Sequence, residues 1–555
     1  MIQLATSHLF HLLGYLLFYS FFYFSGKSFT LLLTRFFKLN EIPKTILFIK
    51  SSFIFPVIGA FAVGNILIIT NFFFPLKSPA VAFIFVIWLL PNLKDIRKPD
   101  LKITPEKVVS YLVIPSLLLV SLYNTGWHYD SGFYHLNHQN WLRESNLIVG
   151  MVNIHWAFGM SSIYEYISSI FWFDKSFKYL HFLNIIFIHF FFISLLDGAK
   201  NSKEKAIKYG SIFLLIFSLL DNFGVGGGRN GFIYIQGVGK QDAAVAIIFL
   251  IVSRAIFLNL KKNTFTNFDL SVTILLSFFA IQIKLSSITL AIILVYLFAV
   301  LIKNRNINFL ELLKISTPSL IFSIIWIFKQ YLTTGCFVYP VNITCINNFS
   351  WYLDGSTETY EAITRNSSYS LPYYDFNFIE WSKYFLSFAI NRTVILNFII
   401  SIVAISIIFI LFAKKQKIKF KFSVEFITFI LINFLYLVNY GPTPRYTMGT
   451  FLLIVFSFGF LIDDFKFNLK SVSIYLLIII SAGSLVRGNS YSAFLESDYS
   501  SGLFDPRNEA IYVEQNNGYL KPDIGDQCWI NLQCTMSIHM ISIDKSSFFS
   551  TAERK

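Results

Sequence analysis

The stretch Ser286–Leu301 reads Ser-Ser-Ile-Thr-Leu-Ala-Ile-Ile-Leu-Val-Tyr-Leu-Phe-Ala-Val-Leu and carries no charged side chain, and the basic cluster Lys303–Arg305 follows it. A helix needs about 20 predominantly apolar residues to cross the hydrocarbon core of a bilayer. Lys and Arg gather on the cytoplasmic side of such helices. The stretch therefore predicts a membrane-spanning helix whose C-terminal end faces the cytoplasm.

Similar apolar runs recur along the whole chain. Of its 555 residues, 55% are hydrophobic and only 14% are charged, whereas soluble domains carry roughly 25% charged residues. We expect an all-α, polytopic transmembrane bundle of about 14 spans. The other predicted spans are Leu9–Lys27, Ile46–Thr70, Pro79–Leu90, Val108–Tyr123, Tyr179–Leu196, Ile207–Leu220, Ala243–Leu258, Leu270–Ile283, Leu310–Phe328, Thr393–Ala413, Val424–Val438, Thr447–Ile462 and Ser471–Val486.

The positive charges follow this topology. The net charge is +14, which in a soluble protein would suggest nucleic acid, but Lys and Arg lie in short clusters between the apolar runs. With the N-terminus outside, every cluster falls in the cytoplasm, as the positive-inside rule requires. The other clusters are Lys27–Lys50, Lys94–Lys107, Lys200–Lys208, Lys261–Lys262, Lys414–Lys421 and Lys466–Lys470.

This topology divides the chain into N-terminal transmembrane helices (1–123), a first outer loop (124–178), a transmembrane core (179–487) with a second outer loop (331–383), and an extracytoplasmic C-terminal tail (488–555). In the first outer loop, Ile154–Phe173 is apolar but is interrupted by Glu165. A further span there would invert the charge pattern downstream. We therefore expect helices that lie at the membrane interface in this loop.

All four cysteines fall in regions predicted to lie outside, and they form two pairs that are close in sequence. Disulfides persist in oxidising compartments, so we predict the bridges Cys336–Cys345 and Cys528–Cys534, with free thiols as the alternative. A zinc site is less favoured, because no His or Cys shows the close ligand spacing typical of zinc.

Asp130 follows a predicted span and stands among aromatic residues, a Gly and three His, including His135. A carboxylate at a membrane–water boundary beside aromatic walls is partly desolvated, which raises its pKa toward that of a useful base. Aromatic faces also suit sugar rings, which present apolar C–H faces. The alternative is that the aromatic residues form an interfacial belt and that Asp130 only caps a helix.

Three more charged residues fall at the outer ends of spans. Asp242 begins one span, Lys284 lies between two, and Arg445 lies in an outer turn stiffened by two prolines. Lys binds phosphate as a point charge, and the Arg fork suits phosphate or pyrophosphate. The alternatives are a tight turn for Lys284 and contact with lipid headgroups for Arg445.

A Gly-rich run, Gly224–Gly231, also falls outside. It lacks the Lys-Ser/Thr of a P-loop and the strand–turn–helix context of a dinucleotide fold. We therefore expect neither ATP nor NAD as a cofactor.

The segment Tyr129-Asp-Ser-Gly-Phe-Tyr-His135, Trp141 and the segment Val149-Gly-Met-Val-Asn-Ile-His155 resemble, in this order, a pattern of a bacterial family of large membrane proteins that is distantly similar to the GT-C glycosyltransferases. Thr443 departs from that pattern, which has Asp at this position. The other similarities are Lys284-Leu-Ser286, Gly335–Pro340 with Trp351, Pro442-Thr-Pro-Arg-Tyr446, and Cys528-Trp529 with Cys534.

This resemblance implies a GT-C-like fold with the active site on the outer side of the membrane. GT-C enzymes transfer sugars from polyprenyl-phosphate donors, and their catalytic carboxylate lies in the first outer loop directly after a span, where Asp130 lies. The implied reaction is an inverting hexosyl transfer with Asp130 as general base. Arg445 and Lys284 would hold the donor phosphate. Asp242, a looser match to an acidic position, is assigned to the same binding site, and His135 or His155 would orient the acceptor.

The expected partners are a polyprenyl-phosphate-linked sugar, a glycan, lipid or protein acceptor, and the bilayer. The expected location is the inner membrane of a bacterium, with the active site on the periplasmic side. No cofactor or metal is required, and the alternative is a divalent metal held by Asp130 with an acid of the second outer loop.

Two other functions share these features: a flippase or transporter of lipid-linked oligosaccharide, and a polysaccharide polymerase or ligase. A transporter should show internal repeats or interrupted helices near the membrane midplane, and the chain shows no clear repeat. A polymerase or ligase would be favoured by several Arg in one outer loop, whereas the second outer loop holds Arg365, apart from Arg392 at the next span. A purely structural membrane protein is the remaining alternative.

Overall fold

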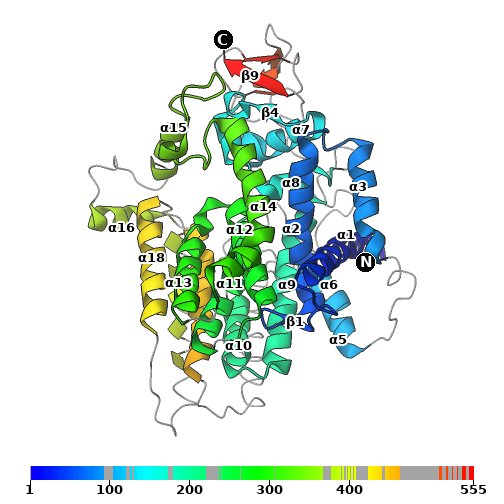
Figure 1. Cartoon of the computed structure of the whole chain (residues 1–555), viewed down its shortest axis with the longest axis vertical. Coiled ribbons are helices and arrows are strands. Elements are labelled where there is room, and N and C mark those ends of the chain that lie inside the picture. The colour runs from blue at the N-terminus through cyan, green and yellow to red at the C-terminus, as the bar shows by residue number, and fades with distance from the viewer. Residues whose placement is uncertain are drawn as a thin grey trace.

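The computed structural model is a largely helical bundle (Figure 1). It describes residues 2–92, 104–119, 126–127, 130–172, 179–220, 237–238, 241–262, 264–304, 307–366, 377–388, 391–392, 395–396, 398–399, 402–403, 406–407, 423–440, 444–462, 512–514, 520–522, 528, 534–535, 541–544 and 549–554.

Six helices of this described part are long and apolar enough to cross a membrane, which confirms the expectation of an α-helical integral membrane protein. They are α1 (Ile2–Phe36), α2 (Ser51–Asn71), α9 (Leu180–Asn201), α11 (Asp242–Lys262), α13 (Thr289–Lys303) with the turn before it, and α14 (Phe309–Thr334). The predicted span Ser471–Val486 lies outside the described residues, as does most of Thr393–Ala413.

Shorter helices complete the bundle. Among them α10 corresponds to the predicted span Ile207–Leu220. The shorter helices are α3 (Pro79–Leu89), α5 (Pro105–Val108), α6 (Ile114–Leu119), α10 (Lys205–Leu220), α12 (Asn267–Ile283), α16 (Phe378–Ser387), α18 (Val424–Tyr440) and α19 (Met448–Ser457).

Short strands, which the all-α expectation did not include, tie loops together. β1 (Thr45–Ile46) pairs with β2 (Ile49–Lys50), and β6 (Tyr512–Glu514) pairs with β7 (Leu520–Pro522), both antiparallel. β3 (Gly126–Trp127) runs parallel to β5 (Gly237–Val238). β9 (Ser550–Arg554) lies between β4 (Ile148–Val149), to which it is parallel, and β8 (Ile541–Asp544), to which it is antiparallel. The chain's last described strand is therefore attached to the first outer loop.

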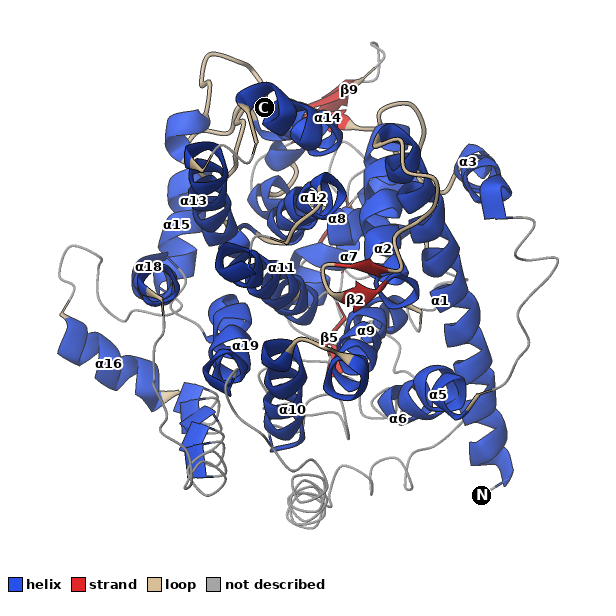
Figure 2. Ribbon diagram, turned by 60° about the horizontal axis from the view of Figure 1, so that its bottom comes forward, coloured by secondary structure: helices blue, strands red, loops and turns tan. Residues whose placement is uncertain are grey.

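Helix α1 runs across the other helices. In Figure 1 it is seen nearly end-on, whereas α2, α14 and α18 run vertically, and Figure 2 shows its full length. The crossing is close because two glycines meet there: a Cβ at Gly26 would collide with the Phe55 carbonyl oxygen, and one at Gly59 with that of Phe22. The predicted span Leu9–Lys27 is thus part of a longer helix that packs closely against α2.

Local sequence signals set the ends of the helices that surround the candidate site. α12 begins at a capping box in which Thr266 and Asp269 satisfy each other's backbone N–H groups. α14 begins at a second capping box, formed by Asn308 and Glu311. It ends at Gly335, whose φ of 80° is the left-handed conformation that closes many helices.

Several described segments predicted to lie outside gather at one end of the bundle. Figure 1 shows α7 (Leu136–Glu144), β4, β9 and α15 (Ser356–Asn366) at the top, while β1, α5 and α10 lie toward the bottom. These upper elements come from the first outer loop, the second outer loop and the C-terminal tail. The upper end of the bundle is called the outer end below.

The stretch Ile154–Phe173, where we expect a helix at the membrane interface, does not form one continuous helix in its described residues. The stretch forms a 3-10 turn, η6 (Trp156–Met160), and a short helix, α8 (Ile163–Ser169), and every residue of α8 is buried. An interfacial helix keeps an apolar face in lipid, whereas α8 packs against α2, α7 and α12. The expectation that this stretch does not cross the membrane agrees with its short elements.

Candidate functional site

A cavity of about 570 Å³ lies at the outer end, between the first outer loop and the membrane helices. It is lined by five of the residues singled out in the sequence, which come from four separate parts of the chain. These residues are Asp130, His135, Asp242, Lys284 and Arg445.

Helix ends bring these residues together. Asp242 is the first residue of α11, and Lys284 follows the last residue of α12. Arg445 lies in the 3-10 turn η10 (Pro444–Thr447), directly before α19. Because α11 packs against both α12 and α19, the three charged side chains meet at the same end of the bundle.

The Lys284 ammonium is bound to the Asp242 carboxylate, with Nζ 2.5 Å from Oδ1. It also lies over the ring of Tyr446, 4.3 Å from the centroid, and the Arg445 guanidinium lies 5.2 Å from the same centroid. Arg445 Nη2 donates a hydrogen bond to the Tyr446 hydroxyl at 3.4 Å. Lys284 is therefore not a plain turn residue: Tyr446 holds two cations side by side, and Asp242 compensates one of them.

Asp130 occupies the N-cap position of the helical turn η4 (Ser131–His135), but its side chain makes no capping hydrogen bond there. It is half-buried and lines the cavity. The charges of Asp242 and Asp130 both favour the charged form of Arg445. The geometry thus sets the Asp130 carboxylate within electrostatic reach of the guanidinium, and a capping role does not account for it.

The structure adds a residue that the sequence did not single out as functional. Glu165 of α8 accepts from the Nδ1 atoms of His135 and His138, each at 2.5 Å, and all three side chains are buried. Burial by itself raises the pKa of Glu165, but the two histidines outweigh it and lower that pKa to about 2. The motif Ser162-x-x-Glu165, a capping box, was the available signal, but it indicates a helix start and not a partner for His135.

We expect this cluster to make the fold sensitive to acid. The folded pKa of Glu165, about 2, lies below its ordinary value of 4.5, so its ionised form adds stability that is complete above about pH 4.5 and is lost as the pH falls toward 2. One pKa unit is worth about 1.4 kcal/mol, so the contribution is about 3 kcal/mol. Thermal unfolding of wild type and Glu165→Gln in detergent measures it. The stability difference should shrink as the pH is lowered from about 6 to about 3, and a constant difference would contradict the assignment.

His155 does not line the cavity. Its Nδ1 accepts from the backbone N–H of Ala157 at 2.9 Å and caps η6. Its ring packs on Trp156, with centroids 5.5 Å apart, and on Phe133, at 4.9 Å. The structure therefore places His155 behind two lining aromatic residues, while His135 lies on the cavity wall.

The two disulfides are Cys336–Cys345 and Cys528–Cys534, the same pairs that the sequence predicts. The first closes the loop after α14, and Phe337 to Pro340 of this loop line the cavity. Among the residues that the structure describes, no three His, Cys, Asp or Glu side chains are grouped as metal ligands.

The backbone groups of Cys528 and Cys534, which form the second disulfide, attach the C-terminal tail to the first outer loop. The Cys528 N–H donates to the Gly132 carbonyl at 2.7 Å. The side chains of Asn137 and Trp141 both donate to the Cys534 carbonyl, at 3.1 and 3.2 Å. The tail thus holds the turn that carries His135 and the helix that follows it.

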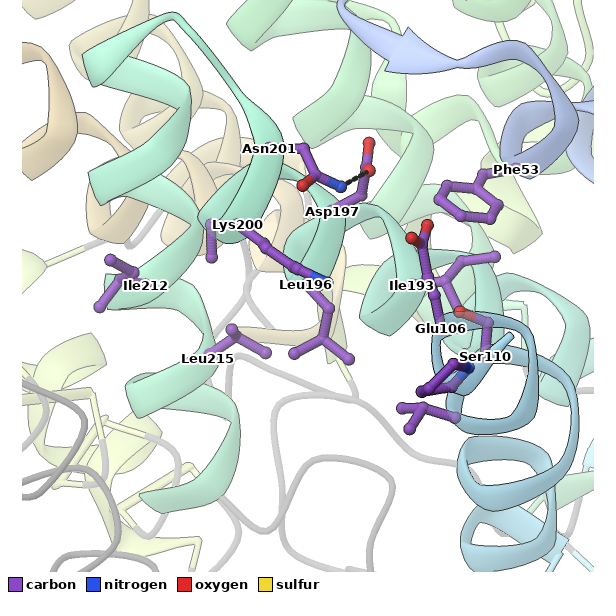
Figure 3. Close-up of a pocket in the computed structure, with 13 residues that line it drawn as sticks. Phe53, Glu106, Ser110, Ile193, Leu196, Asp197, Lys200, Asn201, Ile212 and Leu215 are labelled. Atoms are coloured by element: carbon purple, nitrogen blue, oxygen red, sulfur yellow. Dashed lines mark hydrogen bonds between the residues drawn. The ribbon is translucent and has the colours of Figure 1, made fainter. Parts of the chain in front are cut away.

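A second cavity, of about 560 Å³, lies between α5, α9 and α10 (Figure 3). Its lining is mostly apolar, and Asp197 on its wall accepts a hydrogen bond from Asn201 at 2.8 Å. It contains none of the residues that the sequence singled out. The outer-end cavity is therefore the candidate site.

Residues 9–452 match a family model described as Domain of unknown function (DUF8201). The matched range contains all of the cavity residues and excludes the tail disulfide. No curated protein and no solved structure matches the chain.

Proposed function

We propose that this chain, which belongs to the DUF8201 family, is a membrane glycosyltransferase. It would transfer a sugar from a polyprenyl-phosphate donor to an envelope glycan, lipid or protein acceptor on the outer face of a bacterial inner membrane. The observation that supports this most is that Asp130, Lys284 and Arg445 line one cavity. A candidate base and two candidate phosphate ligands, far apart in sequence, are thereby within reach of one substrate.

The apolar part of the cavity wall suits a lipid chain. Ile288, just before α13, and Ile327 of α14 both line the cavity, and they are 38% and 36% exposed. Their neighbours Ile292 and Ile324 are also exposed, as residues that face lipid would be. A polyprenyl chain would therefore lie between α13 and α14 while its phosphate enters the cavity.

The charge balance favours one type of phosphate. Two cations, Lys284 and Arg445, and two carboxylates, Asp130 and Asp242, line the cavity, and Lys284 is already paired with Asp242. A sugar–phosphate–polyprenyl is a phosphodiester with one negative charge, which a single guanidinium can match with two hydrogen bonds. A pyrophosphate would bring a second charge toward the same carboxylates. We therefore place a monophosphate-linked sugar in the site.

The reaction is a single displacement. The acceptor hydroxyl oxygen attacks the anomeric carbon and its proton passes to Asp130, which acts as general base. The bond between that carbon and the phosphate oxygen breaks, and its electron pair stays on the phosphate. Arg445 and Lys284 stabilise the growing negative charge. The sugar configuration inverts, and the products are the glycosylated acceptor and polyprenyl phosphate.

The test is transfer of labelled sugar by the purified protein in detergent, with polyprenyl-phosphate sugars extracted from bacterial membranes as donors and an envelope-glycan fraction as acceptor. We expect label in the acceptor and release of polyprenyl phosphate. No transfer from any donor, together with movement of labelled lipid across proteoliposomes, would overturn the proposal and favour a flippase. Transfer of whole oligosaccharide blocks would instead indicate a polymerase or ligase.

A further inference from the structure

The outer loops give the cavity an aromatic wall. Trp156 comes from η6, Tyr339 from the loop closed by the Cys336–Cys345 disulfide, and Tyr360 from α15, and all three line the cavity. The ring centroids of Trp156 and Tyr360 are 6.0 Å apart and those of Tyr339 and Tyr360 are 6.4 Å apart. Phe133 of η4 extends the wall, with its ring 6.3 Å from that of Trp156.

Tyr339 makes this wall rigid. Its hydroxyl shares its one proton between the carbonyl oxygens of Trp156, at 3.1 Å, and Ser356, at 3.2 Å, so it links η6 to the start of α15. The side chain is buried, and it packs so closely on Gly159 that a Cβ there would come within 2.6 Å of its ring. Trp156 and Tyr360, whose rings contact each other, remain half-buried. The half-buried rings of Trp156 and Tyr360 are thus held in place by Tyr339, whose own side chain is buried.

The two kinds of wall suit two kinds of substrate. Ile288 and Ile327 are aliphatic and belong to the membrane helices, whereas Trp156 and Tyr360 belong to the outer loops. Flat aromatic faces pack on the C–H faces of sugar rings, and their fixed orientation costs little entropy on binding. A Ser or Thr side chain of a protein acceptor presents no such face, and a lipid acceptor needs no aromatic geometry.

We propose that Trp156 and Tyr360 form the acceptor subsite and that the acceptor is a carbohydrate. This inference rests on the proposed function, since it names the substrate that the same cavity takes beside the donor. The sugar ring of the acceptor packs on these two side chains and presents its hydroxyl group to Asp130.

The experiment first measures binding without turnover. Saturation-transfer NMR with methyl β-glucoside, methyl β-galactoside and methyl α-mannoside is run on the purified protein and on Trp156→Leu and Tyr360→Ala. We expect at least one glycoside to bind the wild type, with affinity lowered about 3- to 10-fold in each variant. Tyr384→Ala, which removes an aromatic residue of α16 outside the cavity, should bind as the wild type does.

Trp156→Phe and Tyr360→Phe test whether an effect comes from misfolding. Both variants keep an aromatic face and should retain most of the wild-type affinity for the glycoside. A loss of affinity as large as that of Trp156→Leu and Tyr360→Ala would overturn the subsite. In the transfer assay, the Leu and Ala variants should raise the acceptor KM by a similar factor and leave the donor KM within about 2-fold.

These outcomes separate the two proposals. Transfer with an acceptor KM that does not change in the variants would overturn the subsite and leave the glycosyltransferase standing. Glycoside binding that depends on Trp156 and Tyr360 without any transfer would support the subsite and overturn the enzyme. No glycoside binding together with transfer to a lipid or peptide acceptor would also overturn the subsite.

Discussion

Asp130→Asn is expected to lower the rate of sugar transfer by about 10²- to 10⁴-fold. The substitution keeps the size of the side chain but removes its negative charge and its ability to accept a proton. The Asp130 side chain makes no capping hydrogen bond in η4, so the helix end loses no backbone partner. The measurement is kcat with a saturating polyprenyl-phosphate sugar, together with the melting temperature in the same detergent.

A matched control comes from the second outer loop. Asp354 is an exposed carboxylate at the same end of the bundle and does not line the cavity. Asp354→Asn should transfer sugar at the wild-type rate. If Asp130→Asn kept more than about a tenth of the wild-type rate, Asp130 would not be the base, and the reaction would have to use another group such as His135.

Arg445→Met is expected to lower kcat/KM for the donor by about 10²- to 10³-fold, the usual effect of removing one preorganised donor to a developing negative charge. Met keeps much of the side-chain length but provides neither the positive charge nor the paired N–H donors of the guanidinium. The loss should fall on both KM and kcat, because the phosphate carries charge before the bond breaks and gains more as it breaks. Initial rates over a range of donor concentrations separate the two parameters.

Arg445→Lys and Arg392→Met complete this experiment. Lys keeps the charge without the two-pronged donor geometry, so the rate should lie between those of wild type and Arg445→Met. Arg392 is exposed and lies away from the cavity, and its loss should change nothing. Equal effects of Arg445→Lys and Arg445→Met, with unchanged melting temperatures, would mean that the fork is essential. A wild-type donor KM in both would remove Arg445 from phosphate binding.

Sequence reasoning found Asp130, His135, Asp242, Lys284 and Arg445 of the cavity, and each of these residues lies at a helix end. Loop charges order the helices, and the order alone puts Asp242, Lys284 and Arg445 on the same side as Asp130. Apolar runs likewise located helices such as α11 and α14, which lie close to their predicted spans.

Contacts between distant segments were beyond the reach of the sequence pattern. The pairing of Lys284 with Asp242 depends on how α11 packs against α12, which neither loop charge nor spacing specifies. Glu165 stands in an apolar stretch, and only the fold brings His135 and His138 onto its two oxygens. The crossing of α1 over α2 depends on the steric match of Gly26 with Gly59, which has no local signature.

The attachment of the tail has a consequence for the order in which the protein matures. The Trp141 side chain donates to a carbonyl that lies 393 residues later in the chain. At about 5–20 residues per second, the ribosome delivers that partner roughly 20 to 80 seconds after Trp141 itself. During this interval the loop that carries Asp130 has been synthesised but lacks its hydrogen bonds to the tail. The Cys528–Cys534 disulfide has yet to form as well. The cavity can therefore reach its final shape only late in biosynthesis, so a chain that stalls before the tail would be inserted in the membrane without a finished site.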